Sequence, residues 1–326
     1  MKHVTILVPE ASVLQAIADP QYLFSAVNGF LQSSGQKPVF EICLAGAKKE
    51  IRLQNGQYSV HVDKLFHEVK KTDLIIIPAI FGDIKAVVAK NGELTEWIRD
   101  QYEKGAELAS LCVGAFLMAS TGLLTGKKCS THWSFANQFR EMFPDVELVE
   151  GCIITEEKRI YSSGGAHSYW NLLLYLVEKY TNREMAVLAS KYFAIDMGRE
   201  SQSPFAIFRG QKEHDDIEIK KAQAYIEAHT DARINIDELA KKMALGRRTF
   251  ERRFRQATHN SVLEYMQRAK IEAAKRLFET SRMSIQQVMY EVGYTDTKAF
   301  RDLFKKITGL TPLLYRNIYH KMAVLK

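Results

Sequence analysis

Cysteine is scarce in this chain of 326 residues, and the four cysteines that occur are scattered. Cys43, Cys112, Cys129 and Cys152 show no Cys-x-x-Cys spacing, so we expect reduced thiols and no metal or other cofactor. The chain also lacks any apolar run near the roughly 20 residues that cross a bilayer, and its N-terminus enters a strand-like segment instead of a signal peptide. These absences favour a cytoplasmic protein with no membrane partner.

Positive charge is distributed unevenly along the chain. Residues 216–326 hold 22 Lys and Arg against 13 Asp and Glu, a net charge of +9, whereas residues 1–215 carry a net charge of −2. A basic surplus confined to one segment is typical of a module that binds a polyanion. An ordinary solvated basic face would give the same count, so charge alone leaves both interpretations open.

The length predicts two domains, because one hydrophobic core seldom organises so many residues. Four apolar runs in the first part are nearly continuous, as in strands buried on both faces: Val4–Val8, Val39–Leu44, Leu74–Ile77 and Leu108–Cys112. Amphipathic stretches separate them, which indicates an α/β fold with a doubly wound, mostly parallel, flavodoxin-like sheet. Turn and breaker residues then predict a first domain over residues 1–198, a linker over 199–216 and an all-α domain over 217–326.

The last third of the chain holds one helical unit twice. Phe250 and Phe254 mark the same turns as Phe300 and Phe304, fifty residues later. Each unit contains a predicted capping box, a short apolar helix, a turn and a second helix; the boxes are Asn235–Glu238 and Ser284–Gln287, and the second helices are about Arg247–Thr258 and a helix capped by Asp296. One long helix over Val262–Leu277 would hold the units at a fixed separation. This layout predicts a tandem helix-turn-helix.

The second helix of each unit has an outward basic face. At about 100° per residue, Arg248, Arg252 and Arg255 cluster opposite Phe250 and Phe254. In the second unit the outward residues are Lys298, Arg301, Asp302 and Lys305. The phenylalanines are interpreted as core, because stacking on bases would need exposed positions. Arg247 and Arg253 flank the buried face, where a phosphate or structural role is favoured over base contact.

These residues resemble the AraC/XylS family of bacterial transcription regulators over about Ile217–Arg316. The most specific stretches are Ala269–Phe278, Val292–Phe304 and Gly309–Arg316. The resemblance implies that the second helix of each unit enters the major groove of double-stranded DNA. Carried over by position, the reading residues are Arg248, Glu251, Arg252, Arg255, Thr297, Lys298, Arg301, Asp302 and Lys305. Arg252 is the best candidate for direct readout, because Arg can bond guanine O6 and N7 together.

Two positions depart from this family's pattern. Gly246 lies where the family prefers a serine N-cap, and Asp302 lies where it commonly has arginine. Asp302 could accept a hydrogen bond from cytosine N4, or it could pair with Arg301 or Lys298 and read no base.

A second signal lies at residues 108–117, where a strand runs through a turn into a helix with Cys112 at the bend. Nucleophiles use this elbow layout, and the positive end of the following helix would favour a thiolate. The alternative is that Cys112 is a small apolar residue at a tight junction, since free cysteine is among the most buried residue types.

The first part also resembles the DJ-1/PfpI family, of the class I glutamine amidotransferase-like folds, over about residues 2–195. The shared features are the elbow cysteine at Cys112, the pair Thr131-His132, and Gly164-Gly165 before a closing helix. The glutamate that family enzymes carry after the first strand has no clear counterpart, and Val113 stands where peptidase-type members often have histidine. His132 is the only candidate for the base that a thiolate needs. Because these other family features are missing, we expect the domain not to be an enzyme.

The two modules together resemble the GlxA-like branch of AraC regulators, in which the first domain keeps a pocket and loses the reaction. The resemblance implies a small effector, often nitrogenous, a homodimer, and RNA polymerase as a further partner. In an open α/β sheet the pocket should lie outside the carboxyl ends of the strands. The candidate pocket residues are Cys112, Val113, Gly114, His132, Ala79 and Ile80. A cysteine-dependent amidase or peptidase and a thiol redox sensor remain open as alternatives.

Overall fold

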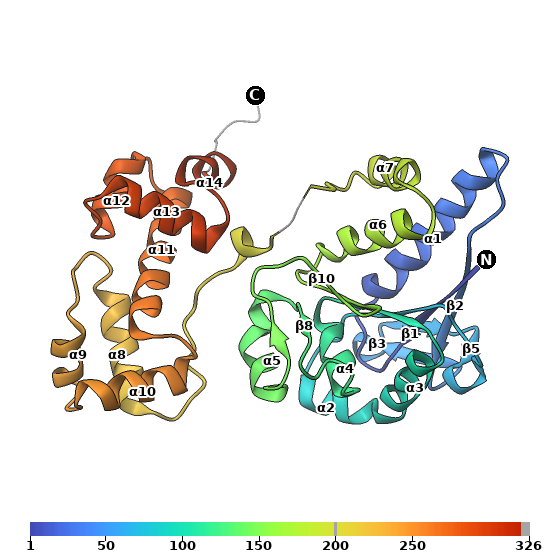
Figure 1. The fold of residues 1–326 in the computed structure, drawn as a ribbon, viewed down its shortest axis with the longest axis horizontal. Coiled ribbons are helices and arrows are strands. Elements are labelled where there is room, and N and C mark those ends of the chain that lie inside the picture. The colour runs from blue at the N-terminus through green and yellow to red at the C-terminus, as the bar shows by residue number, and fades with distance from the viewer. Residues whose placement is uncertain (199–200, 321–326) are drawn as a thin grey trace. The chain divides into compact units, whose positions relative to one another are not determined.

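A computed structural model describes residues 1–198 and 201–320, and its contacts divide the chain into two compact units, Met1–Gln202 and Ser203–Lys326 (Figure 1). We call them the N-terminal unit and the C-terminal unit. None of the helices within the described residues is long and apolar enough to cross a lipid bilayer.

The N-terminal unit is built on a seven-stranded sheet in the order β10-β11-β7-β6-β1-β2-β5. The strands are β1 (Lys2–Val8), β2 (Phe40–Gly46), β5 (Lys64–Leu65), β6 (Leu74–Ile77), β7 (Glu107–Leu111), β10 (Ile154–Glu157) and β11 (Ile160–Ser163). All neighbours are parallel except β10 and β11. The central order β2-β1-β6-β7-β11 is that of flavodoxin-like folds, which confirms the predicted α/β class.

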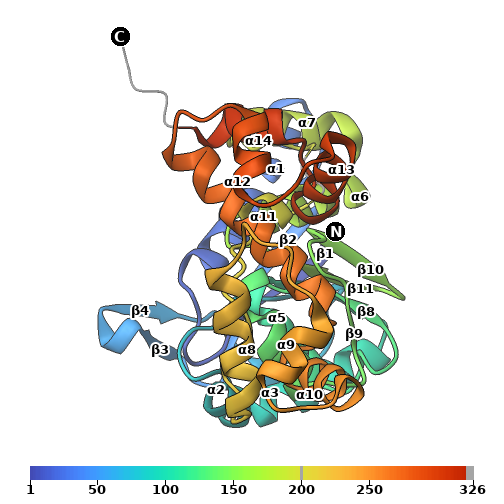
Figure 2. The ribbon, with the colours of Figure 1, turned by 90° about the vertical axis from the view of Figure 1, so that its left-hand side faces the viewer.

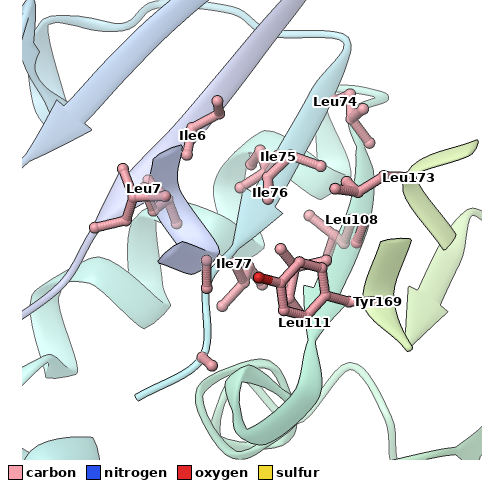
Figure 3. Packing of buried hydrophobic residues seen from close by; sticks show 14 of the residues in the cluster. Ile6, Leu7, Leu74, Ile75, Ile76, Ile77, Leu108, Leu111, Tyr169 and Leu173 are labelled. Atoms are coloured by element: carbon pink, nitrogen blue, oxygen red, sulfur yellow. The ribbon is translucent and has the colours of Figure 1, made fainter. Parts of the chain in front are cut away.

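Helices cover both faces of this sheet (Figure 1). On one face lie α1 (Gln15–Ser33), α6 (Tyr169–Tyr180) and α7 (Arg183–Tyr192), and on the other lie α2 (Ile84–Lys90), α3 (Gly92–Glu103) and α4 (Ala115–Ser120). The strands are therefore buried on both sides, which explains why their sequences are continuously apolar. Figure 3 shows Tyr169 and Leu173 of α6 packed beside Leu108 and Leu111 of β7.

Smaller elements of the N-terminal unit were not expected from the sequence. They are the pairs β3 (Glu50–Leu53) with β4 (Tyr58–His61) and β8 (Lys128–Cys129) with β9 (Glu147–Leu148), and the helix α5 (Ala136–Met142). The four predicted strands are present, but Cys112 starts the turn after β7 instead of ending the strand.

Every regular element among the described residues of the C-terminal unit is a helix. Its helices are α8 (Ile217–Ala228), α9 (Ile236–Lys242), α10 (Arg247–Thr258), α11 (Val262–Thr280), α12 (Ile285–Glu291), α13 (Thr297–Thr308) and α14 (Pro312–Tyr319). We call α9–α10 the first repeat and α12–α13 the second repeat. Two hydrophobic cores underlie them, one around Phe250 and Phe254 and one around Phe300 and Phe304, and α11 contributes to both. Figure 2 shows α11 running between the two repeats.

The helix ends follow the predicted signals closely. α8 begins at Ile217 and α10 spans Arg247–Thr258, as expected. The capping box of Ser284 and Gln287 is complete, with both reciprocal hydrogen bonds. The capping box predicted at Asn235 is only half formed: the Asn235 side chain accepts from two backbone amides, but the described contacts include no bond from the Asn235 amide to the Glu238 carboxylate.

The segment expected to be a linker, residues 199–216, is divided between the two units where the structure describes it. Ser201 pairs with Cys152 in the N-terminal unit. Beyond Ser203 the chain packs on the C-terminal unit: Lys275 Nζ donates to the Ala206 carbonyl at 2.6 Å, and the Phe208 amide donates to Glu272 Oε2 at 3.1 Å. Lys275 and Glu272 form a buried ion pair at 2.8 Å, so residues 206–208 are fastened to α11 by a desolvated pair.

Candidate DNA-reading helices and elbow pocket

The outward face of α10 presents its arginines as the helical spacing predicts. Phe250 and Phe254 are buried, while Arg248, Arg252 and Arg255 are exposed. No described side chain makes an ion pair or hydrogen bond with the guanidinium of Arg248 or Arg252. A guanidinium without a partner keeps its full set of donors available for phosphate or a base edge.

The two flanking arginines of α10, Arg247 and Arg253, are bonded to carboxylates of the protein itself. Arg253 donates from Nε and Nη2 to the Asp216 carboxylate at 2.8 and 2.7 Å. This bidentate bond is the main reason that the pKa of Asp216 lies below its ordinary value. Arg247 bridges Asp237 at 2.9 Å and Glu251 at 3.2 Å. Glu251, placed in the reading set by family resemblance, is half-buried and holds a neighbouring arginine.

The outward face of α13 is exposed along its whole length. It consists of Thr297, Lys298, Arg301, Asp302 and Lys305. Asp302 Oδ1 lies 3.8 Å from Arg301 Nε, and both side chains are exposed. A pair of this length at the surface is weak, so contact with DNA could replace it at little cost.

The elbow geometry at Cys112 is present. Its φ is 55°, in the left-handed region that side chains rarely adopt, and it begins a 3-10 turn over Cys112–Gly114 that leads into α4. Cys112 is only 4% exposed, and burial raises the pKa of its thiol to about 12. The Val113 amide bonds the sulfur and opposes this rise only in part. Burial therefore favours the protonated thiol, in line with the alternative that Cys112 is a small apolar residue at a tight junction.

The described hydrogen bonds of the His132 ring are to Ser134 and not to the Cys112 thiol. Its Nδ1 accepts from the Ser134 amide at 3.2 Å and lies 2.7 Å from Ser134 Oγ. Burial lowers the pKa of His132, which favours the neutral form of the ring. The neighbour that reaches the elbow is Thr131, whose Oγ1 donates to the Cys112 carbonyl at 3.1 Å. Among the described residues, no basic side chain makes a hydrogen bond with the Cys112 thiol.

The other expected pocket residues, Ala79, Ile80, Val113 and Gly114, are buried. The loops after β1 and β6 bond to each other where the strand order reverses: the Val13 amide donates to the Ala79 carbonyl, and the Phe81 amide to the Ala11 carbonyl, both at 2.8 Å. A cavity of about 40 Å³ lies nearby, lined among others by Pro9, Lys48 and Asn91 but not by Cys112. It has room for about one or two water molecules.

Asp19 is a polar residue of this region that sequence reasoning missed. Its Oδ2 accepts from the Tyr169 hydroxyl at 2.7 Å and from Trp170 Nε1 at 3.0 Å, and Tyr169 lies within electrostatic reach of Cys112. The described residues provide no basic partner for this half-buried carboxylate. One signal was available: Asp19 is the single charged residue within Gln15–Ser33.

Gln202 was also missed. It is 2% exposed, and its Nε2 donates to the Thr131 carbonyl at 2.8 Å while its Oε1 accepts from the Trp133 amide at 3.1 Å. A Cβ at Gly164 would lie 2.1 Å from Gln202 Nε2, so only glycine admits this side chain. The last residue of the N-terminal unit is thus built into the wall that carries Thr131 and His132.

The described residues contain no group of three or more His, Cys, Asp and Glu side chains that could hold a metal ion. The candidate sites therefore consist of two basic helix faces in the C-terminal unit and a buried polar elbow in the N-terminal unit.

Comparison with known proteins matches each unit to a family. Residues 239–318 match the helix-turn-helix domain family, and residues 18–179 match the DJ-1/PfpI family. The HTH-type transcriptional regulator GbdR of Pseudomonas aeruginosa is 27% identical over 74% of this chain and 65% of its own length. The regulator CdhR of the same species is 25% identical over 80% of this chain and 76% of its own length. The regulator GlxA of Rhizobium meliloti is 22% identical over 69% and 72%.

Solved structures share the fold over much of the chain. An AraC family transcriptional regulator from Pseudomonas putida has a TM-score of 0.50 and 17% identity over 59% of this chain and all of that one. A ThiJ/PfpI family protein from Pseudomonas syringae has a TM-score of 0.50 and 12% identity over 82% of this chain and 88% of that one. The chain spans slightly less than two thirds of the length of GbdR, at 65%.

Proposed function

We propose that the chain binds double-stranded DNA through α10 and α13, and that a small molecule bound near Cys112 controls this binding. The chain belongs to the AraC/XylS family of transcriptional regulators and carries a DJ-1/PfpI-like domain before the helix-turn-helix repeats. The homodimer, the contact with RNA polymerase and the location in the bacterial cytoplasm that the family implies belong to the same proposal.

The two basic faces support DNA as the partner. They lie on equivalent helices of a segment whose net charge is +9, and Arg248 and Arg252 are unpaired among the described residues. Phosphate neutralisation supplies most non-specific affinity, whereas a bidentate arginine supplies base discrimination. We assign Arg252 to base readout and Lys305 to a phosphate.

The observation that carries effector control is the attachment of Gln202. This side chain is bonded into the Thr131–Trp133 wall of the elbow region, and the next residue begins the C-terminal unit. Only three residues lie between Gln202 and Ala206, whose carbonyl accepts a hydrogen bond from Lys275 of α11. A ligand that moves the wall would therefore pull on the helix that both repeats share.

Asp19 indicates the chemistry of that ligand. A half-buried carboxylate with two aromatic donors and no described basic partner favours a cation, and neighbouring Tyr169 and Trp170 rings can add cation–π attraction. We propose a small amine or ammonium compound as the effector class.

The state of Cys112 argues against the enzyme and redox-sensor alternatives. A thiol with a pKa near 12 is almost wholly protonated at neutral pH, and neither nucleophilic catalysis nor fast oxidation proceeds from the protonated form.

Selection of bound duplexes from a random pool by the full-length protein tests the DNA part of the proposal. We expect a bipartite consensus, and failure to enrich any sequence would contradict it.

A thermal-shift screen with small amines and ammonium compounds tests the ligand part. A hit should raise the melting temperature of the wild type, lose that effect in Asp19→Asn and change the affinity for the selected duplex. A ligand that stabilises the protein but leaves DNA affinity unchanged would contradict effector control.

A further inference from the structure

Lys270 lies at the point of α11 where one hydrophobic core ends and the next begins. Ala269 is the last buried α11 residue of the first core, and Ile271 is the first of the second core. α11 itself is one connection between the repeats (Figure 2). The side chain of Lys270 makes another.

The ammonium group of Lys270 donates three hydrogen bonds to backbone carbonyls. Thr230 O at 2.7 Å and Ala232 O at 3.0 Å belong to the loop that leads into α9 of the first repeat. Val292 O at 3.0 Å ends α12 of the second repeat. An ammonium has three donors, so all of them are used. A cation also suits the C-terminal end of a helix, where the macrodipole is negative.

Gly293 lets the two repeats approach at this point. Its φ is +72°, and a Cβ there would lie 2.2 Å from the Asp231 carbonyl oxygen and 2.8 Å from Lys270 Nζ. The turn of the second repeat therefore packs backbone to backbone on the loop of the first. Half-buried Lys270 is not on either outward face, and burial lowers its pKa although the Asp231 carboxylate opposes this.

We infer that Lys270 sets the register between the two recognition helices and so decides which spacing of two half-elements on DNA the protein accepts. The inference rests on the proposed function, because it requires α10 and α13 to read one duplex. α11 fixes the distance between the two repeats along its axis. A single helix does not fix the rotation of the repeats about that axis, because its side-chain contacts with each repeat can shift. Three hydrogen bonds that gather carbonyls from both repeats restrain that twist. Removing the donors leaves the carbonyls unsatisfied at the joint.

The test measures the affinity of full-length protein for three duplexes. The first is the selected site, the second carries one inserted base pair between its half-elements, and the third contains a single half-element. One inserted base pair rotates the half-elements by about 34° relative to each other, so the wild type should lose about tenfold or more in affinity. Lys270→Met keeps the length of the side chain without its donors. We expect it to reduce this discrimination about tenfold and to leave binding to the single half-element unchanged.

Three further variants separate register from general damage. Lys270→Arg keeps several donors and should retain most of the discrimination. Arg276→Met removes an exposed cation from the same helix and should weaken both two-element duplexes equally, so that their ratio is unchanged. Gly293→Ala presses on the joint from the other side while keeping Lys270, and it should lose discrimination as Lys270→Met does. If Lys270→Met fails to fold, Gly293→Ala decides.

Wild-type discrimination in Lys270→Met and Gly293→Ala would overturn the inference. A parallel loss of binding to the single half-element would also overturn it, because the substitution would then damage one reader instead of the spacing. If the wild type binds none of the three duplexes, the proposed function itself is contradicted.

Discussion

Adjacent arginines of α10 have opposite surroundings, and this difference assigns their roles. Arg252 is exposed without a described partner, whereas Arg253 is locked in a bidentate bond to Asp216. A guanidinium can serve a carboxylate or a base edge in this way, but not both at once. Side-chain type and charge are the same at both positions, so the position on the helix and the partner that the fold supplies separate a reading residue from a structural one.

Arg252→Ala should relax preference at one base position by about 1–3 kcal/mol, because a bidentate contact with guanine is lost. Lys305→Ala should weaken all sites similarly and lower the salt slope by about one unit. Competition binding across single-base variants of the selected site, repeated at several salt concentrations, measures both effects. Arg253→Ala is the matched control, and it should leave the base preference unchanged while destabilising the C-terminal unit. Uniform weakening by Arg252→Ala would refute the readout assignment.

Cys112 should react slowly with an alkylating agent in the folded protein. With a pKa of about 12, the thiol is ionised at pH 8 in about one molecule in ten thousand, so alkylation should be about a thousandfold slower than for free cysteine. The rate should rise about tenfold per pH unit as the thiolate fraction grows, as long as the fold persists. Mass spectrometry of iodoacetamide-treated native protein measures this at Cys112. Rapid stoichiometric labelling that disappears in Cys112→Ala would favour a nucleophile or redox sensor.

At the scale of elements, the fifty-residue repeat extends further than the two helix-turn-helix pairs. α10 and α13 have equivalent bounds, and Thr258 and Thr308 each bond the carbonyl four residues earlier, of Phe254 and Phe304. Ser261 caps α11 and Thr311 caps α14, again fifty residues apart. α14 is therefore the second copy of the start of α11. The fifty-residue offset and the Thr311-Pro312 pair are the sequence signals of this additional helix.

The N-cap of α10 offers a test at this scale. Gly246 has φ −69° and ψ 143°, which suit a side-chain cap, but glycine has no side chain to accept a hydrogen bond, and nothing lies within 4 Å of the place where a Cβ would stand. Gly246→Ser should therefore stabilise the C-terminal unit by about 0.5 kcal/mol, since the hydroxyl can accept from an unsatisfied amide. Chemical denaturation of the full-length protein measures it. Ser284→Gly, at the cap of α12, is the opposite change and should destabilise; equal stability in all three proteins would contradict the capping argument.

At the scale of the whole molecule, Gln202 is where a change in one unit can reach the other along the chain. Gln202→Ala removes the bonds to Thr131 and Trp133 and leaves buried backbone groups unsatisfied, which should cost about 1–3 kcal/mol in the N-terminal unit. Effector binding and DNA binding should both persist, but the effector should no longer alter DNA affinity.

Isothermal titration of the effector with and without DNA measures this coupling. Because coupling is reciprocal, DNA should alter effector affinity in the wild type and not in Gln202→Ala. Gln36→Ala, at an exposed position of the same unit, is the control and should keep the wild-type response. Undiminished coupling in Gln202→Ala would mean that the signal travels by another route.

The sequence alone determined the elements that depend on local pattern. Continuous apolar runs predicted β1, β2, β6 and β7. Period-3.6 spacing with capping residues predicted the bounds of α10, the start of α11 and the N-cap of α13. The buried phenylalanines and the outward arginines followed from the same geometry. Such patterns are readable because a helix or strand repeats its own environment at short range.

The tertiary structure decided everything that depends on partners far apart in the chain. Asp19 meets Tyr169 across 150 positions, Gln202 meets Thr131 across 71, and Lys270 meets Thr230 across 40. The protonation of Cys112 likewise depends on how completely the rest of the N-terminal unit excludes water from it. Hydrogen-bond partners and desolvation are set by the packed neighbourhood, which no local periodicity encodes.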